Sequence, residues 1–465
     1  MTVRITEKFS QNPEIPAGPI FEMISVNIIL IILYLIIVLA IGYFSSRKES
    51  KEDFLIGRRK LGMFGLALTI AATIIGGNAL VTYTSFIYEF GIAIAWGLLG
   101  LLFGLVILTL IGRKLKDAGK KYLTLSDFFE DKFGRKTALV VTIIVIFWYL
   151  VILLIQFIAG GKIIESLLGF PYWIAIILMG LTVFLYSFLG GFKAVVKTDA
   201  FQYLLFLILA LFIGFSLVKG RTFTPSTFNI MKLGIVQSIA FVILGAATIF
   251  TGPDMWQRVY AAKSKKIISK GIFIAGILIV LGLIAIGMIG LSASTIPGLE
   301  PQEAFIQGLT NLLPPGFLGI TFVLLFAVIM STLDTLLFVL STSFSKDIVT
   351  NHFNPKVDKV KYTKIGMLIF SVIAMLIAIF VQDIVSLGLA FISMGLVFTP
   401  VIIWAVFFKK LPDYRSVILS LITGVLAVII VLSAGMIGPE TSVVSLPVAL
   451  VFIFVGQLLW RKKKT

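Results

Sequence analysis

Stretches of about 20 apolar residues, each long enough as a helix to cross a hydrocarbon layer ~30 Å thick, recur along the 465-residue chain. Because 59% of the residues are hydrophobic and only 13% are charged, about half the charge of a soluble domain, the sequence predicts an all-α polytopic membrane protein. We expect about 13 transmembrane helices. They lie near 24–44, 63–90, 92–111, 138–164, 171–189, 199–218, 233–262, 270–292, 316–345, 364–381, 383–407, 415–436 and 443–460.

Lysine and arginine are concentrated in alternate loops between these stretches. The net charge of +17 could suggest nucleic acid as a partner, but its distribution follows the rule that cytoplasmic loops are basic. We therefore expect a lipid bilayer and no nucleic acid, an N-terminus outside, a C-terminus inside, and a first helix that is retained rather than cleaved as a signal peptide. The basic loops are 45–62, 112–137, 190–199, 253–270, 346–364, 408–415 and the tail 461–465.

The chain contains no cysteine and a single histidine, His352, in a charged loop. The lack of cysteine excludes disulfides, a thiolate nucleophile and a sulfur-ligated metal. A lone histidine in such a loop is far more often solvated than a metal ligand. Composition therefore gives no support for a catalytic or structural metal centre.

One apolar stretch carries a run of polar side chains between Phe326 and Thr335. At helical spacing Ser331, Asp334 and Thr335 share one face, and Thr332 lies one turn before Thr335. Burying such groups in lipid without partners costs several kcal/mol. Hydroxyl and carboxylate oxygens at this spacing suit a small hard cation such as sodium. The alternative, a polar patch that joins two helices, explains serine and threonine well but explains an intramembrane aspartate poorly.

Two stretches contain residues that interrupt a helix at mid-depth. The stretch 63–90 is interrupted at Gly76, Gly77 and Asn78, and the stretch 233–262 is interrupted from Thr251 to Pro253. Either break alone could be close helix packing or a simple kink. As a matched pair, five stretches apart, they predict an inverted-repeat transporter whose substrate binds near the membrane midplane.

A third motif, Tyr186–Gln202, joins the fifth and sixth stretches. Its paired glycines predict a tight cytoplasmic turn, after which Thr198 and Asp199 open the next helix. An alternative explanation of these two residues is a simple helix cap at a wet boundary.

Segments spread along the chain together resemble the solute:sodium symporter family, which includes sodium-coupled proline, pantothenate, sialic acid and glucose carriers. The resemblance covers residues 24–407 in the family's order and spacing, and it implies a LeuT-type fold of five-plus-five inverted repeats. The domains are then a tail, extra helix and loop at 1–62, the first repeat at 63–218, the second at 219–407, and two C-terminal helices with a basic tail at 408–465. The matching segments are Asp53–Gly62, Gly190–Gln202, Gln257–Ser264, Met330–Thr335 and Ser341–Asp347.

The resemblance also implies two cation sites. Some relatives bind a second sodium with an aspartate at the position of Asp199 and two serines at the positions of Asp334 and Thr335. The aspartate at 334 departs from that pattern, and two carboxylates around one ion favour a shared proton, a more tightly held ion or a salt bridge. The common sodium site would consist of the backbone carbonyls of Ala72, Ile75 and Val328 and the hydroxyls of Ser331 and Thr332.

Substrate contacts implied by the resemblance fall at the two breaks. Sugar carriers have a glutamate-glutamine pair where this chain has Asn78 and Ala79, which argues against a sugar. Pro253 matches the proline and pantothenate carriers, although the tryptophan that proline carriers place at the Asn78 position is missing. Aromatic residues in apolar spans more often pack than bind ligand. The implied contacts are Gly76, Gly77, Asn78, Gly252 and Pro253, with Trp148 and Tyr149 nearby.

We therefore expect a multi-pass cell-membrane transporter, not an enzyme, that imports a small-molecule substrate by sodium symport and alternating access. Half-helix N-termini favour a carboxylate, so an amino acid such as proline, or a small carboxylate, is the first expectation. A sugar or vitamin symporter and a non-transporting sensor of the same fold are the alternatives. A channel would need a continuous file of polar residues across the membrane. A sensor of this kind would need a histidine kinase, and an enzyme would need more titratable groups than Asp199 and Asp334.

Overall fold

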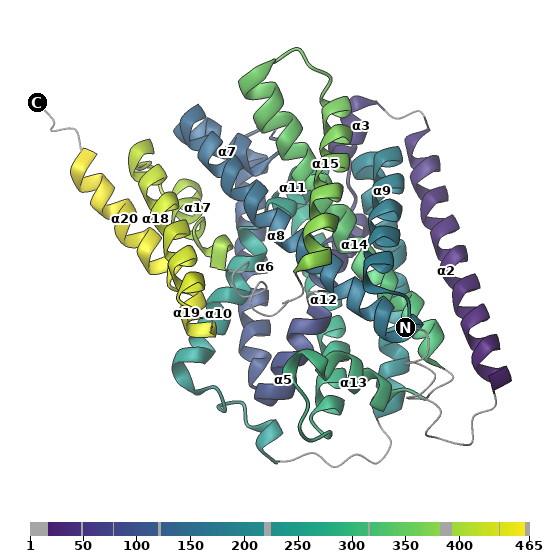
Figure 1. Cartoon of the computed structure of the whole chain (residues 1–465). Coiled ribbons are helices and arrows are strands. Elements are labelled where there is room, and N and C mark those ends of the chain that lie inside the picture. Colours follow the sequence, from purple (N-terminus) through teal and green to yellow (C-terminus); the bar gives the residue numbers. More distant parts are fainter. Residues whose placement is uncertain are drawn as a thin grey trace, which may run out of the picture.

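A computed structural model describes residues 17–47, 50–77, 79–119, 122–217, 225–314, 317–381, 393–436 and 438–460. The regular structure of these residues is helical, joined by short loops, and their β-type pairing is limited to one parallel bridge between Leu61 and Ala262 (Figure 1). The first half contains α2 Ala17–Ser46, α3 Lys51–Ile56, η1 Gly57–Arg59, α4 Met63–Ile74, η2 Ala79–Tyr83, α5 Thr84–Phe90, η3 Gly91–Ile94, α6 Ala95–Asp117, α7 Leu125–Phe133, α8 Arg135–Leu168 and α9 Tyr172–Leu217.

The second half continues the all-helical pattern. It contains η4 Pro225–Phe228, α10 Gly234–Phe250, α11 Pro253–Ala261, α12 Lys265–Ala293, η5 Pro301–Glu303, α13 Ala304–Leu312, α14 Leu318–Ser343, η7 Phe344–Phe353, α15 Lys359–Phe380, α17 Thr399–Phe407, α18 Tyr414–Ser433, α19 Pro439–Ser442 and α20 Ser445–Trp460.

Both predicted interruptions lie where the sequence places them. Helix α4 ends at Ile74, Ile75 leaves helical geometry (φ −88°, ψ 77°), and a π-helical turn resumes at Ala79. Helices α10 and α11 meet at 45°, with Gly252 extended (ψ 119°) and Pro253 at the first position of α11. Proline is favoured there because the first helical N–H has no intrahelical partner. Two spans are therefore broken at mid-length and leave backbone groups free for other partners.

The fifth and sixth predicted stretches lie within α9, which consists of two helical segments that meet at Gly191. Gly191 takes φ 52° and ψ −149°, which is not helical geometry and breaks α9 between the two segments. A residue with a Cβ is disfavoured at this positive φ, and the Cβ would also lie 2.6 Å from the Phe54 carbonyl oxygen. The paired glycines thus form the predicted break between two helices, but Thr198 and Asp199 lie about two turns inside the second segment, so they neither open nor cap it.

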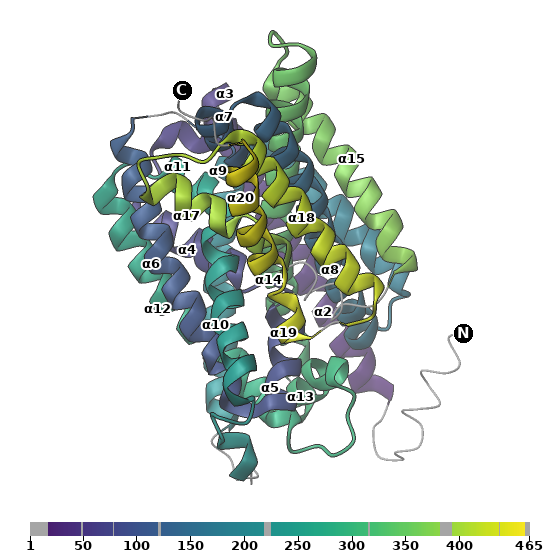
Figure 2. The same cartoon turned by 90° about the vertical axis from the view of Figure 1, so that its left-hand side faces the viewer.

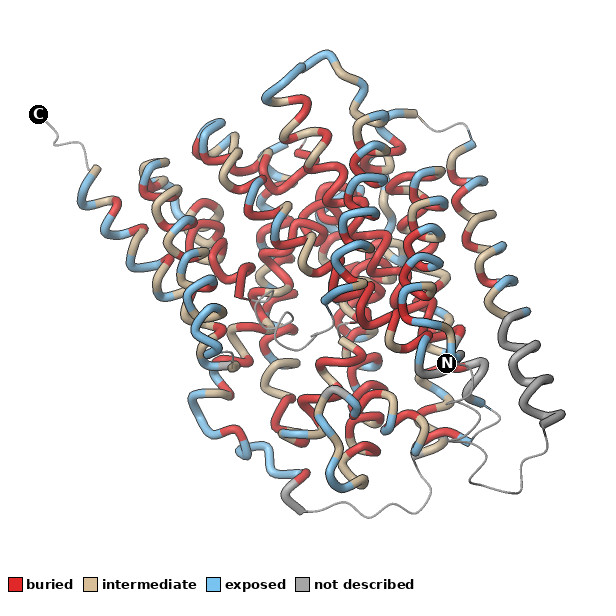
Figure 3. Tube along the Cα trace, in the orientation of Figure 1, coloured by how far each residue is buried: buried red, intermediate tan, exposed pale blue. Residues whose placement is uncertain are grey.

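Helix α14 forms the centre of the molecule. The described residues of its apolar window are all buried, and it packs against α8, α9, α15 and α2. Figure 3 shows buried residues concentrated in this interior and exposed residues on the outer helix faces. Those outer faces are strongly apolar, with Phe273, Phe380 and Leu458 each more than 70% exposed. An apolar exterior around a packed interior is the arrangement of a protein whose solvent is lipid.

Among the described residues, nine helices are long and apolar enough to cross a membrane, and the bent pair α10–α11 makes a tenth. The expected 13 spans differ because α9 contains two of them, α4 is short, and the stretch 383–407 begins outside the described residues. In Figure 1, α3 and α7, which belong to basic loops, lie at one end, whereas α5 and α13 lie at the other. The total of 13 and the orientation of the termini stay predictions.

Candidate functional site

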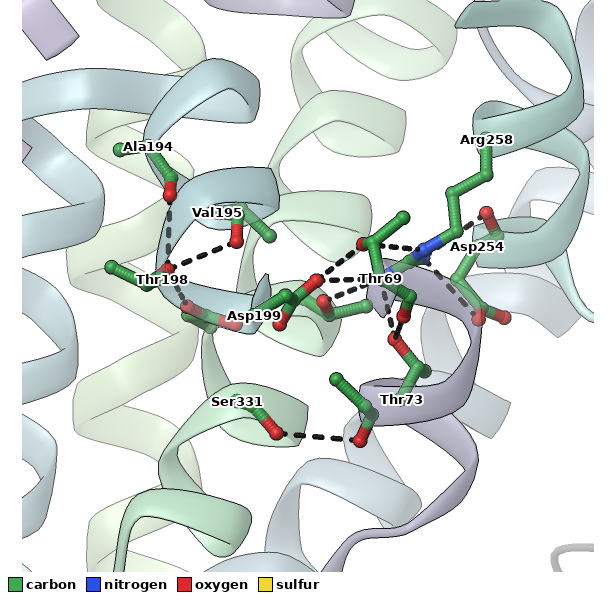
Figure 4. A network of polar contacts seen from close by, with 12 residues as sticks. Thr69, Thr73, Ala194, Val195, Thr198, Asp199, Asp254, Arg258 and Ser331 are labelled. Carbon is green, nitrogen blue, oxygen red and sulfur yellow. Dashed lines mark hydrogen bonds and ion pairs between the residues drawn. The ribbon is translucent and has the colours of Figure 1, made fainter. Parts of the chain in front are cut away.

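The residues predicted for the common sodium site meet where α4 ends against the middle of α14. The Ser331 hydroxyl lies 2.8 Å from the Val328 carbonyl oxygen and 3.3 Å from that of Ala72, so it links the two helices (Figure 4). The Thr332 hydroxyl is buried without a partner among the described residues. Uncharged oxygens that converge in a dry interior can coordinate a monovalent cation.

The break in α4 allows this close approach. A Cβ at Gly76 would lie 2.1 Å from the Thr332 hydroxyl oxygen, so no larger residue fits without moving α14. Ile75, one residue earlier, is buried and has left helical geometry, while its N–H still donates to the Ala71 carbonyl. Three of the five predicted sodium-site residues, Ala72, Val328 and Ser331, are thus in contact; Thr332 faces Gly76, and Ile75 lies at the break.

Asp334 lies one turn further along α14, fully buried. One carboxylate oxygen, Oδ2, accepts hydrogen bonds from the hydroxyls of Tyr186 and Thr198, each at 3.0 Å. The other oxygen, Oδ1, has no partner among the described residues. Two neutral hydroxyls orient this carboxylate, but no ion pair to it is found in the described part of the chain.

Asp199 is also fully buried, but it has a cationic partner. Its Oδ2 accepts a hydrogen bond from the Thr69 hydroxyl and lies 3.3 Å from Nη2 of Arg258. Its Oδ1 has no partner among the described residues. The alternative that Asp199 caps a helix at a solvated boundary is therefore wrong, because Asp199 lies in the packed interior, against α4 and α11.

Arg258 is the functional side chain that sequence reasoning missed, although it lies in one of the matching segments. Its side chain is 2% exposed and reaches two acids, with Nη1 3.5 Å from Asp254 and Nη2 3.3 Å from Asp199. Nε donates to Thr69, and Nη2 also donates to Thr73 and to Thr335 at 2.8 Å. A planar fork of five donors can join three helices in this way, whereas a lysine cannot.

These contacts define an acidic cluster of three carboxylates, Asp199, Asp254 and Asp334, against one guanidinium. The sequence allowed a salt bridge to Asp334. In the structure, Asp199 and Asp254 form ion pairs with Arg258 instead. The predicted second-ion ligands are thus divided: Asp199 and Thr335 contact Arg258, and Asp334 does not. Buried charge without a counter-ion is costly, so the excess of carboxylates over guanidinium must be balanced by protonation or by a bound cation.

A cavity of about 200 Å³ adjoins this region, between the two breaks. Its wall is mostly apolar, and its few polar groups include the side chains of Gln156 and Asp254. The Gln156 Oε1 is buried without a partner among the described residues. Other described lining residues include Thr73, Gly76, Thr82, Phe86, Phe241, Thr248 and Thr332.

The predicted substrate residues relate to this cavity in different ways. Gly76 lines it, whereas Gly77, Gly252, Pro253 and the two aromatics are not among its described lining residues, and Asn78 lies outside the described residues. The Tyr149 hydroxyl bonds the Asp254 carboxylate, and Trp148 stacks on Phe398 with ring centroids 5.9 Å apart. Gln156 was not predicted from the sequence. An amide side chain in the middle of an apolar span was the signal that could have indicated it.

Comparison with known proteins agrees with this geometry. A model of the Sodium:solute symporter family matches residues 54–220 and 215–424, so the chain belongs to that family. The sodium/proline symporter 2 of Staphylococcus saprophyticus is 26% identical over 435 residues, which cover 86% of this chain and 85% of that protein. The sodium/proline symporter of Staphylococcus aureus strain Newman is 26% identical over 436 residues, with the same coverage.

Solved structures agree on the fold. The substrate-bound, outward-open structure of a sodium-coupled sialic acid symporter superposes with a TM-score of 0.75 at 17% identity, covering 94% of this chain and 98% of that one. MhsT in complex with L-phenylalanine gives a TM-score of 0.51 at 15% identity, covering 85% and 99%. The expected family is confirmed, and the chain is a multi-pass, LeuT-type helical membrane protein, which in bacteria lies in the cell membrane. The family's activity is sodium-coupled solute transport.

Proposed function

We propose that this protein imports a small, partly apolar amino acid such as proline, or a small carboxylate, together with sodium by alternating access. The observation that carries the proposal is the contact of Ser331 with the carbonyls of Ala72 and Val328, at the point where α4 breaks. An ion at this point would be bound by both α4 and α14. Its binding would therefore fix the position of the broken helix that borders the substrate cavity.

In the proposed sodium site, carbonyls of Ala72, Ile75 and Val328 and the hydroxyls of Ser331 and Thr332 bind the ion. The buried Thr332 hydroxyl, which has no partner among the described residues, supports this assignment because such a group otherwise costs about 1–3 kcal/mol. These ligands carry no formal charge. They therefore bind sodium weakly enough to release it, as transport requires.

A second cation near Asp199, Asp334 and Thr335 is also proposed. Its support is the excess of carboxylates over guanidinium in the acidic cluster, together with the oxygens Oδ1 of Asp199 and of Asp334, which have no partner among the described residues. Because Arg258 already contacts Asp199 and Thr335, a second cation would bind closer to Asp334 or would displace the guanidinium. The cation would be sodium or a proton.

The substrate class is supported by the size and lining of the cavity. A volume of about 200 Å³ bordered by Phe86, Phe241 and other apolar side chains suits a small solute with an apolar part. A sugar would leave several hydroxyls without partners in such a wall, at a cost for each group. Gln156 and Asp254 are among the few polar residues that line the cavity, and the named relatives are sodium/proline symporters.

The test is uptake into proteoliposomes that contain the purified protein, driven by an inward sodium gradient. A panel of amino acids, carboxylates, vitamins and sugars identifies the substrate. Liposomes with equal sodium on both sides, and liposomes with the Thr332→Ala variant, are the controls. We expect sodium-dependent accumulation of proline or another small amino acid. Accumulation of a sugar or a vitamin alone would overturn the substrate class, and uptake of no compound would favour the sensor.

A further inference from the structure

An apolar groove runs along the outer surface between α6 and α12, the two helices at the left of Figure 2. Its volume is about 530 Å³, and its walls include Val106 on α6 and Phe273 and Ile277 on α12, all about half exposed or more. At its floor the two helices approach closely, because a Cβ at Gly276 would lie 3.3 Å from Leu105 Cδ1. The groove is an elongated hollow in a helical face that lies at membrane depth.

Both walls of the groove continue into basic residues at the same end. On α6 the stripe of lining residues reaches Thr109 and Leu110, and exposed Arg113 follows one turn later. On α12 the stripe begins at Ser269, and exposed Lys265 and Lys266 lie one turn before it.

The basic end is held together across the two helices. Lys265 forms an ion pair with Asp117 of α6, which fixes the ends of α6 and α12 beside each other. This end thus carries the exposed cationic side chains of Arg113, Lys265 and Lys266, and Asp117 balances one of them. The end of the groove carries net positive charge, and the hydroxyls of Thr109 and Ser269 lie where the apolar wall begins.

We propose that this groove binds one anionic phospholipid, with an acyl chain in the hollow and the phosphate group at Arg113 and Lys266. The shape and the apolar wall suit a hydrocarbon chain, and the cations complement a headgroup of net negative charge. A zwitterionic lipid gains less, because its own ammonium would lie near the same cations. A second copy of this chain, related by a two-fold axis, would place like charges from both copies together and is disfavoured.

The experiment measures lipid retained by the purified full-length protein. Protein in mixed vesicles of phosphatidylglycerol and phosphatidylcholine is extracted, and native mass spectrometry counts each lipid. We expect the wild type to retain phosphatidylglycerol at least fivefold over phosphatidylcholine. Arg113→Gln/Lys266→Gln, which leaves the Lys265–Asp117 pair intact, should bring this ratio near one. The matched control, Lys409→Gln/Lys410→Gln near α18, removes the same charge elsewhere and should leave the ratio unchanged.

A second variant tests the hollow separately from the charge. Ile277→Trp fills the groove while keeping every cation, and it should lower phosphatidylglycerol retention at least threefold. Equal losses in the Arg113/Lys266 variant and its control would show that diffuse membrane charge is responsible and would overturn the proposal. So would unchanged retention in Ile277→Trp. The measurement needs no substrate or sodium gradient, so its outcome is independent of the transport proposal.

Discussion

Asp199 and Asp334 are both fully buried, on neighbouring helices, yet their surroundings differ in charge. Asp199 has a guanidinium 3.3 Å away, whereas Asp334 is held by the hydroxyls of Tyr186 and Thr198. A buried carboxylate with a fixed counter-ion is a structural element, since its charge is already balanced. One held only by hydroxyls among the described residues has no fixed counter-ion, so a proton or a mobile cation can balance it. The charge on the α9–α11 side is therefore fixed, and the proposed second cation belongs to the α14 side.

The largest expected effect follows from removing the fixed counter-ion. Arg258→Gln leaves Asp199 and Asp254 buried without their cation, which costs about 3–5 kcal/mol. We expect a clear fall in melting temperature and a loss of uptake of at least about a hundredfold, since each factor of ten is ~1.4 kcal/mol. Thermal unfolding in detergent and proteoliposome uptake measure both effects.

Two companion variants separate charge from geometry at this position. Arg258→Lys keeps the charge without the planar fork and should give an intermediate result. Adding Asp199→Asn to Arg258→Gln should recover part of the lost stability, because the stranded carboxylate is then neutral. Wild-type stability and transport in Arg258→Gln would show that the comparison between the two aspartates is wrong.

A smaller effect is expected at the carboxylate without a fixed partner. Asp334→Asn keeps the shape of the side chain and removes its charge, so the number of cations moved per substrate should fall by one. We expect the sodium half-saturation of uptake to change by about three- to tenfold, or ~0.7–1.4 kcal/mol. Charge movement per substrate molecule in proteoliposomes measures the stoichiometry.

The matched control for this prediction is Asp347→Asn, which also neutralises a buried carboxylate but lies in η7, where Asp347 accepts a hydrogen bond from Thr124. It should leave the stoichiometry unchanged. If Asp334→Asn couples the same number of cations as the wild type, Asp334 does not hold a transported cation.

The smallest effect is expected at the first break, on the substrate side. Asn78→Ala removes a donor and an acceptor next to Gly77 and should raise the substrate half-saturation about two- to tenfold, the equivalent of ~0.5–1.5 kcal/mol for one hydrogen bond. Sodium binding measured without substrate should stay within about twofold of the wild type. Loss of sodium binding with an unchanged substrate profile would reassign Asn78 to the ion.

The features that the sequence predicted well are local ones. Apolar stretches determine where the spans lie, and glycine and proline in mid-span determine where they break, each within a few residues along the chain. Accordingly, α4 ends near Gly76 and α11 begins at Pro253, as expected. The glycine pair likewise predicted the break between the two segments of α9, where Gly191 leaves helical geometry. The close packing of Gly191 against Phe54, far away in sequence, was not predictable from the pattern.

Long-range partners in the site were not predictable from the pattern. Arg258 contacts Thr69, which lies 189 positions earlier, and no periodicity encodes that pairing. Arg258 lies four residues after Asp254 in a matching segment, but nothing in the local pattern indicates which distant groups it contacts. The polar run indicated Ser331 and Thr332, but the other three sodium-site residues were named only through the family resemblance, because they contribute backbone carbonyls that any residue possesses. Their roles therefore depend on the α4 break and on its contact with α14.

The most direct test of this account is equilibrium binding of radioactive sodium to the purified protein without substrate, for the wild type and for Ser331→Ala/Thr332→Ala. The double variant removes two of five proposed ligands at the α4–α14 contact. We expect saturable binding in the wild type and at least about tenfold weaker binding in the variant, equal to ~1.4 kcal/mol, with an unchanged melting temperature in sodium-free buffer. Identical binding curves for the two proteins would contradict a sodium site at Ser331 and Thr332.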